Sequence, residues 1–98
     1  MIIAVDFDGC LASKKAGQMT PNMILICRLK WQQASGSTVI LWTCREGRSL
    51  MEALAFLRSC SFVPNFVNQN CPEGIRKLGH DSRKIYADIY LDDKGVRI

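Results

Sequence analysis

Two short apolar runs mark the strands that we expect at the centre of the fold. Residues 2–5 read Ile-Ile-Ala-Val, and residues 38–42 read Thr-Val-Ile-Leu-Trp. Both runs are too short for a helix, and neither alternates between apolar and polar positions. Uninterrupted apolar and β-branched residues are typical of strands that are buried on both faces of a parallel sheet. The sequence therefore predicts two buried strands of such a sheet.

We predict one helix between these two strands and another after the second strand, because apolar residues recur there at helical spacing. Thr20-Pro21 has the form of an N-cap followed by proline at the first helical position, and Gly36 supplies a C-terminal stop. A second helix is expected over about residues 48–60. The apolar positions are Met23, Ile26, Cys27, Trp31 and Ala34 in the first helix and Leu50, Ala53, Leu54 and Leu57 in the second.

The rest of the chain completes an α/β pattern. We predict a short strand at residues 66–67, an irregular stretch with one turn of helix at 68–82, and a last strand at 85–91. Alternating strands and helices indicate a parallel sheet flanked by helices and wound by right-handed crossovers. The prediction is a single-domain, Rossmann-like α/β fold over residues 1–98.

Composition limits the function classes. The 98 residues are 48% apolar and 22% charged, which is ordinary for one globular domain. A net charge of +4 without long Lys/Arg runs gives no indication of nucleic-acid binding. No apolar stretch approaches the roughly 20 residues needed to cross a membrane, and the N-terminus lacks the basic start of a signal peptide. We therefore expect a cytoplasmic protein without a membrane partner.

The five cysteines do not form a metal-binding or disulfide pattern. They are odd in number, contain no Cys-x-x-Cys pair, and are accompanied by a single histidine, His80. We predict reduced thiols that are mostly buried, and a His80 that lies in a surface loop. Trp31 and Trp42 are expected to pack in the core or on a sheet face.

Acidic residues follow the predicted strands. Asp6 and Asp8 come after the first strand, Thr43 ends the second, and Asp92 and Asp93 follow the last. Ligands of parallel sheets bind at the carboxyl ends of the strands. Crowded carboxylates repel each other at neutral pH unless a cation lies among them, and an oxygen-only ligand set suits Mg²⁺. The sequence therefore predicts a magnesium site at this edge of the sheet.

The same residues suit phosphoryl transfer. Strand alternation sends Asp6 and Asp8 to one side, so that one carboxylate can attack while the other handles protons. An aspartyl-phosphate intermediate divides one difficult displacement into two easier ones. Thr43 and Lys84 would hold the phosphoryl oxygens, although Lys84 precedes its strand and must reach the site from a loop.

In order along the chain, these residues resemble the four motifs of the haloacid dehalogenase-like (HAD) hydrolases. Residues 6–10, Asp-Phe-Asp-Gly-Cys, resemble the first motif, with cysteine in place of the usual threonine. Residues 41–43, Leu-Trp-Thr, resemble the second, Lys84 the third, and residues 91–93, Leu-Asp-Asp, the fourth. The sequence is especially similar to small capless bacterial and phage members of the family described as phosphatases.

The resemblance implies a Mg²⁺-dependent phosphatase that hydrolyses a phosphomonoester of unknown identity. Asp6 would be the nucleophile and a metal ligand, and Asp8 the general acid and base, with its main-chain carbonyl on the metal. Asp92 would complete the protein ligands, with Asp93 as a further ligand or a support. An aspartate at position 8 favours phosphate ester hydrolysis over carbon–halogen cleavage.

Several points stay open. Lys84 lies only eight positions before Asp92, closer than in many relatives, so Lys77 is a rival for the phosphate-binding lysine. Arg45 either contacts the substrate or a metal-side carboxylate, or it pairs with Glu46 or Glu52. Lys14 and Lys15 form a solvated loop tip that can also meet an anionic substrate.

The segment between Asp6 and Pro21 has room for a small flap and no cap domain. The chain ends shortly after the fourth motif, which we expect to leave a bare sheet edge and to allow a homodimer. Two other functions are a non-catalytic Mg²⁺-binding phosphoacceptor and a degenerate HAD-like binding module. The first is disfavoured because residues 66–68, Phe-Val-Asn, hold no acceptor aspartate.

Overall fold

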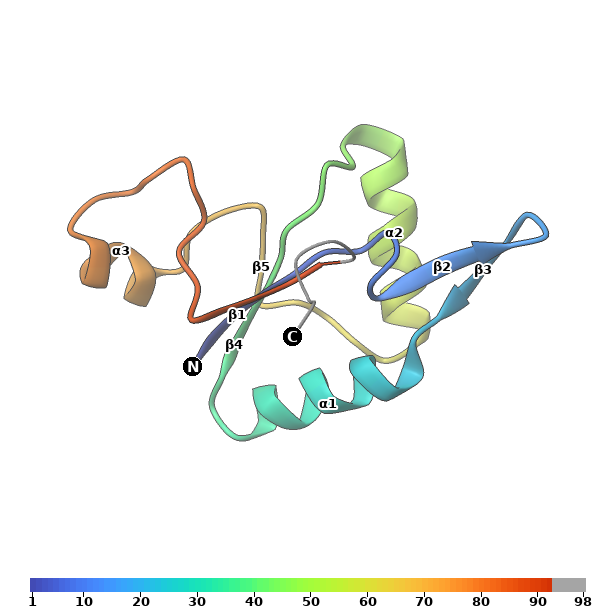
Figure 1. Ribbon diagram of the computed structural model, residues 1–98, viewed down its shortest axis with the longest axis horizontal. Helices are drawn as coiled ribbons and strands as arrows, with labels where there is room; N and C mark the ends of the chain where they lie inside the picture. The colour runs from blue at the N-terminus through green and yellow to red at the C-terminus, as the bar shows by residue number, and fades with distance from the viewer. Residues whose placement is uncertain (93–98) are drawn as a thin grey trace.

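The computed structural model describes residues 1–92 and contains a central parallel sheet, helices and a separate two-stranded hairpin (Figure 1). The elements are β1 (Ile2–Val5), β2 (Ala12–Lys15), β3 (Gln18–Pro21), α1 (Met23–Ala34), β4 (Thr38–Leu41), α2 (Gly47–Ser59), β5 (Phe66–Val67), α3 (Pro72–Leu78) and β6 (Ile89–Leu91). The sheet has the order β5-β4-β1-β6, with every neighbouring pair parallel. The prediction of a single α/β domain with a parallel sheet flanked by helices is confirmed.

Strand β1 is the buried centre of this sheet. It pairs with β4 from Ile2–Thr38 to Val5–Leu41 and with β6 from Ile3–Ile89 to Val5–Leu91. All four residues of β1 are buried. Apolar clusters cover both faces of the sheet, with Ile3 and Val5 in one and Ile2 and Ala4 in the other. The uninterrupted apolar run of β1 reflects this two-sided burial.

Helices α1 and α2 cover one face of the sheet. Ala53 and Leu57 of α2 are fully buried, and Leu50 and Leu54 pack beside them, so the predicted apolar face of α2 is confirmed. The opposite face is covered by the segment that contains α3 and residues 85–87. No helix within residues 1–92 is long and apolar enough to cross a membrane.

The predicted start and face of α1 are wrong. Pro21 is the last residue of β3, and the N-cap is Asn22, whose side chain accepts a hydrogen bond from the Leu25 N–H at 3.2 Å. The helix buries Ile26 and Leu29, whereas Trp31 is 74% exposed. The helix carries apolar residues on two stripes, and only its docking on the sheet decides which stripe is buried. Of the two tryptophans, Trp42 alone packs on the sheet, against the ring of Tyr90 at 5.6 Å.

The last strand is shorter than predicted, and the helix before it is longer. Strand β6 covers only Ile89–Leu91, and α3 has seven residues. The Tyr90 hydroxyl donates to the Ile85 carbonyl and accepts from the Ala87 N–H, which holds residues 85–87 away from the ladder. Ile85 and Ala87 are nevertheless buried against the sheet, which explains their apolar character.

The prediction that the cysteines are mostly buried is wrong, because only Cys71 of the five is buried. Cys10 and Cys60 are half-buried, whereas Cys27 and Cys44 are exposed. His80 is exposed between α3 and the last strand, which confirms its place in a surface loop.

Candidate functional site

Two of the predicted acidic residues, Asp6 and Asp92, are backbone neighbours where β1 and β6 end. The Asp6 N–H donates to the Leu91 carbonyl at 2.8 Å, which extends the parallel ladder by one residue. This register places Asp6 beside Asp92, on strands that lie about 4.8 Å apart. Both residues are half-buried, and the Asp6 carboxylate accepts a hydrogen bond from the Phe7 N–H at 2.7 Å. Asp93 lies outside the described residues.

A tight turn follows Asp6 and leads into the hairpin. Phe7 is fully buried, and its carbonyl accepts hydrogen bonds from the Leu11 and Ala12 N–H groups at 3.0 and 3.1 Å. Gly9 has a φ of 77°, a left-handed conformation that favours glycine. The turn leaves Asp8 exposed and starts the β2–β3 hairpin at the carboxyl end of β1 (Figure 1). This hairpin occupies the place where the sequence leaves room for a small flap.

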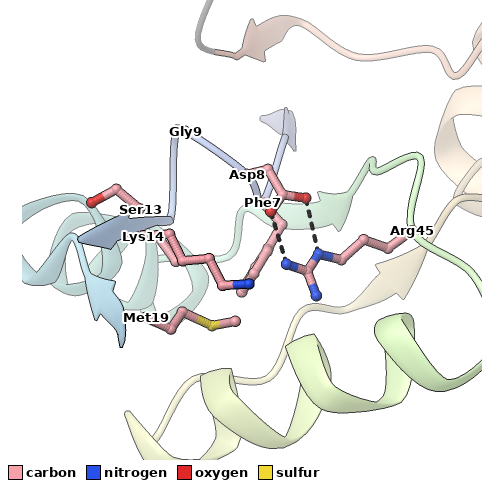
Figure 2. Close-up of a pocket in the computed structure, with 8 residues that line it drawn as sticks. Phe7, Asp8, Gly9, Ser13, Lys14, Met19 and Arg45 are labelled. Carbon is pink, nitrogen blue, oxygen red and sulfur yellow. Dashed lines mark hydrogen bonds and ion pairs between the residues drawn. The ribbon is translucent and has the colours of Figure 1, made fainter. Parts of the chain in front are cut away.

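Arg45 binds Asp8 through two parallel hydrogen bonds. Its Nε donates to Oδ2 and its Nη2 to Oδ1, both at 2.9 Å (Figure 2). The guanidinium also lies 4.8 Å from the centroid of the Phe7 ring, and Nη1 donates to the Ser49 carbonyl at 3.0 Å. Of the two alternatives for Arg45, contact with a carboxylate of the site is therefore the one found. The hydrogen bond from Arg45 lowers the pKa of Asp8, and the Lys14 charge acts in the same direction.

Replacing Arg45 by glutamine is expected to raise the pKa of Asp8 toward its ordinary value of 3.8. Because the pKa of Asp8 is lower in the folded than in the unfolded chain, the ion pair stabilises the fold above about pH 4. This contribution is lost as the pH falls through the folded-state pKa. The Asp8 side chain is 61% exposed, so we expect it to be at most about 1 kcal/mol at pH 7.

A carboxyl-carbon NMR titration of Asp8 measures the pKa change, and urea unfolding at pH 7 and pH 3 measures the stability. Arg48→Gln is a matched control, because Arg48 is an exposed arginine in the first turn of α2, close in sequence to Arg45. An Asp8 pKa that is the same in the wild type and in Arg45→Gln would show that the ion pair does not hold in solution.

Thr43 is fixed at the end of β4, beside β1. The Trp42 N–H donates to the Val5 carbonyl at 2.8 Å, so the ladder continues to Trp42, the residue before Thr43. The Thr43 N–H donates to Asn68 Oδ1 at 2.8 Å, and its hydroxyl accepts from the Arg45 N–H at 3.1 Å. Asn68 was not among the predicted site residues. Its signal is an asparagine directly after a short strand, where its φ of 52° is a conformation that asparagine tolerates.

The two candidate lysines lie in different parts of the molecule. The Lys84 ammonium lies 6.0 Å from the ring centroid of Tyr90, two residues before Asp92, and the lysine is exposed. Lys77 is in α3, where Asp88 and then Glu73 raise its pKa. The Asp88 carboxylate accepts from the Ile2 N–H at 2.7 Å, at the amino end of β1. Lys77 therefore lies by the opposite end of the sheet from Asp6, whereas Lys84 lies over β6.

Asn70 organises the segment that carries Lys84. It is a buried polar residue whose side-chain nitrogen donates to Asp81 Oδ1 at 3.0 Å and to the Ser82 carbonyl at 2.8 Å. Its side-chain oxygen accepts from the Tyr86 N–H at 2.6 Å. These bonds hold the chain on both sides of Lys84, so Asn70 determines how Lys84 can reach the candidate site. The strand pattern in the sequence did not identify Asn70.

A hollow of about 260 Å³ lies between the Asp8–Arg45 ion pair and the hairpin (Figure 2). Its apolar wall is formed by Phe7, Ala12 and Met19, and its polar lining includes Asp8, Lys14 and Arg45. The hollow thus adjoins the carboxylate that the sequence assigns to proton transfer.

The oxygen donors at this edge of the sheet suit magnesium better than a metal that needs a complete protein cage. Residues 1–92 hold no group of three or more acidic, histidine or cysteine side chains able to bind a metal ion. Asp6 and Asp92 are register neighbours, so their carboxylates are the candidate metal ligands at this edge. The Asp8 carboxylate is bound to Arg45, which leaves the Asp8 main-chain carbonyl as the candidate ligand from that residue. Mg²⁺ commonly binds through one or two carboxylates and retains several waters.

Comparison with known proteins identifies a relative of the chain but no activity. The sequence matches no protein-family model and no curated protein. It is similar to a solved structure of a conserved protein coded by a locus of Bacteroides thetaiotaomicron, with 33% identity and a TM-score of 0.79. The similarity covers 98% of this chain and 78% of that one. This chain and the conserved Bacteroides protein therefore belong to the same family.

Proposed function

We propose that this protein is a Mg²⁺-dependent phosphomonoester hydrolase with a capless, Rossmann-like fold of the HAD type. The observation that carries the proposal is the register of β1 with β6, which makes Asp6 and Asp92 neighbours at the carboxyl ends of paired parallel strands. Asp8 lies in the turn after β1, and Thr43 lies two residues past the end of β4, the strand on the other side of β1. These residues supply the groups that phosphoryl transfer requires, which are a nucleophile, a proton-transfer group and a phosphate-binding hydroxyl.

In the first step, the Asp6 carboxylate attacks phosphorus and the bond from phosphorus to the leaving oxygen breaks. A proton from Asp8 neutralises the leaving oxygen, and an alcohol departs. In the second step, Asp8 takes a proton from water, the water oxygen attacks phosphorus, and the Asp6–phosphate bond breaks. Inorganic phosphate leaves and both aspartates return to their starting forms.

Charge on the phosphoryl oxygens requires stabilisation in both steps. The Thr43 hydroxyl accepts a hydrogen bond from the Arg45 N–H, and the Thr43 N–H donates to the Asn68 side-chain oxygen. Lys84 would approach from the segment that Asn70 holds. Asp6, Asp92 and the Asp8 carbonyl would hold Mg²⁺. When bound, the ion would neutralise charge on the phosphoryl group and lower the repulsion between phosphate and carboxylate.

The Asp8–Arg45 ion pair has a consequence for the choice of substrate. A lowered pKa keeps Asp8 ionised at neutral pH, which suits the activation of water but disfavours proton donation. Substrates whose leaving oxygen needs no proton should therefore react faster than simple alkyl phosphates. The same ion pair favours a second candidate function, a module that binds phosphorylated ligands without hydrolysing them.

Turnover separates these two functions. We expect the folded protein to hydrolyse p-nitrophenyl phosphate repeatedly with Mg²⁺, to stop on addition of EDTA, and to resume when Mg²⁺ is added in excess. Turnover rates on a panel of sugar phosphates, nucleotides and phosphopeptides then show which class of leaving group the protein prefers. If no phosphomonoester is hydrolysed by folded protein with Mg²⁺ present, the hydrolase proposal is wrong and the binding module is favoured.

A further inference from the structure

We propose that Lys14 is a specificity residue that recognises a second anionic group on the leaving group of the substrate. This inference rests on the proposed function, because Asp8 is the group that would give a proton to the leaving oxygen. The leaving group must then lie next to Asp8. The hollow between the Asp8–Arg45 ion pair and the hairpin is the space available there, and Lys14 lines it (Figure 2).

The register of the hairpin directs Lys14 toward this hollow. Lys14 pairs with Met19 across the antiparallel ladder, and both residues line the hollow. Side chains of paired residues lie on the same face of a hairpin, and neighbours along a strand alternate between faces. Lys15 pairs with Gln18 and therefore belongs to the other face. Of the two adjacent lysines, only Lys14 is presented to a ligand beside Asp8.

The charges around the hollow leave Lys14 as the group able to bind an anion. Arg45 uses Nε and Nη2 on Asp8 and Nη1 on the Ser49 carbonyl, so the charges of Arg45 and Asp8 balance. Lys14 is exposed, and no ion pair joins its ammonium to a carboxylate within residues 1–92. Figure 2 shows its side chain extending toward the Asp8–Arg45 ion pair. The hollow therefore carries one excess positive charge.

The walls of the hollow limit the rest of the leaving group. Phe7 and the hairpin residues Ala12 and Met19 form the apolar part of the lining, near the Asp8 carboxylate. An apolar ring or short chain can pack against this surface while an anion at its far end meets the Lys14 ammonium. The substrate class is thus a phosphomonoester whose leaving group combines an apolar body with a carboxylate or a second phosphate.

The test compares 4-carboxyphenyl phosphate with its uncharged carboxamide analogue. We expect wild-type kcat/KM to favour the carboxylate about twofold to fivefold, the range of an exposed ion pair. Lys14→Ala should remove this preference, Lys14→Arg should keep it, and Lys15→Ala should leave it unchanged. The preference should also fall when salt is raised to about 0.5 M, because exposed charges are then screened.

Failure of this inference can be distinguished from failure of the proposed function. The role of Lys14 would be overturned if Lys14→Ala lowered kcat/KM equally for both substrates. It would also be overturned if Lys15→Ala removed the preference for the carboxylate as Lys14→Ala does. In both cases the proposed hydrolysis itself stands. If wild-type protein hydrolyses neither compound, calorimetric binding of the same pair supplies the readout. Tighter binding of the carboxylate that depends on Lys14 then supports the anion site. Equal binding of the two compounds overturns it.

Discussion

Replacing Asp6 by asparagine is expected to lower phosphomonoester turnover by about 10³-fold or more, because the amide cannot act as the attacking nucleophile. The fold should be retained, since the asparagine side-chain oxygen can still accept the hydrogen bond from the Phe7 N–H. Steady-state kinetics with Mg²⁺ measure the loss. Mass spectrometry of rapidly quenched wild-type protein should find phosphate on the peptide that contains Asp6, and none on the variant.

Asp88→Asn is a matched control for this experiment. Asp88, like Asp6, accepts a 2.7 Å hydrogen bond from a backbone N–H, but it does so at the amino end of β1. Its replacement should leave turnover unchanged. Asp6→Asn protein that turns over at the wild-type rate would show that the nucleophile lies elsewhere or that the chemistry does not pass through an aspartyl-phosphate.

Replacing Phe7 by alanine is expected to lower the free energy of unfolding by about 3–5 kcal/mol. Phe7 is fully buried, packs edge-on against Phe56 at 6.1 Å, and supports the Arg45 guanidinium at 4.8 Å. The alanine variant would lose these contacts and leave a cavity beneath the site. Such a loss is a large fraction of the stability of a domain of this size. Urea unfolding measures it.

Phe7→Leu separates the packing of Phe7 from its position in the turn. The leucine keeps most of the buried apolar volume, so its cost should be no more than about 1.5 kcal/mol. Arg45 would lose the aromatic ring beneath it in both variants, but a cavity would form only in the alanine variant. A Phe7→Ala variant within 1 kcal/mol of wild type would show that the turn after β1 is not anchored to the core.

The strands were predictable because the central sheet is buried on both faces. Residues 2–5 and 38–41 are uninterrupted apolar runs in the sequence and pair as β1 and β4 in the structure. The length of the last strand was overestimated because residues 85–87 are also apolar. These residues pack on the sheet without joining its ladder. An apolar run shows that a segment is buried, but it does not show which hydrogen bonds the backbone makes.

The candidate site was only partly predictable. The sequence placed Asp6, Thr43 and Asp92 at strand ends, and parallel register then brings such ends together. It left Arg45 between two alternatives, and the structure brings it to Asp8. Asn68 and Asn70, which hold Thr43 and the segment before β6, had no periodic signal. Their partners are 25 and 16 residues away along the chain, so no local pattern could identify them.

By itself, the sequence determined which segments are buried against the sheet and which polar residues follow them, because burial on a two-sided sheet requires apolar residues in an unbroken run. Only the tertiary structure decided which stripe of α1 faces the sheet, which carboxylate Arg45 binds, and which of the two hairpin lysines faces the hollow. Each of these depends on how separate elements dock against one another. The energy of docking comes from contacts between residues that are distant in the chain, and local periodicity does not encode them.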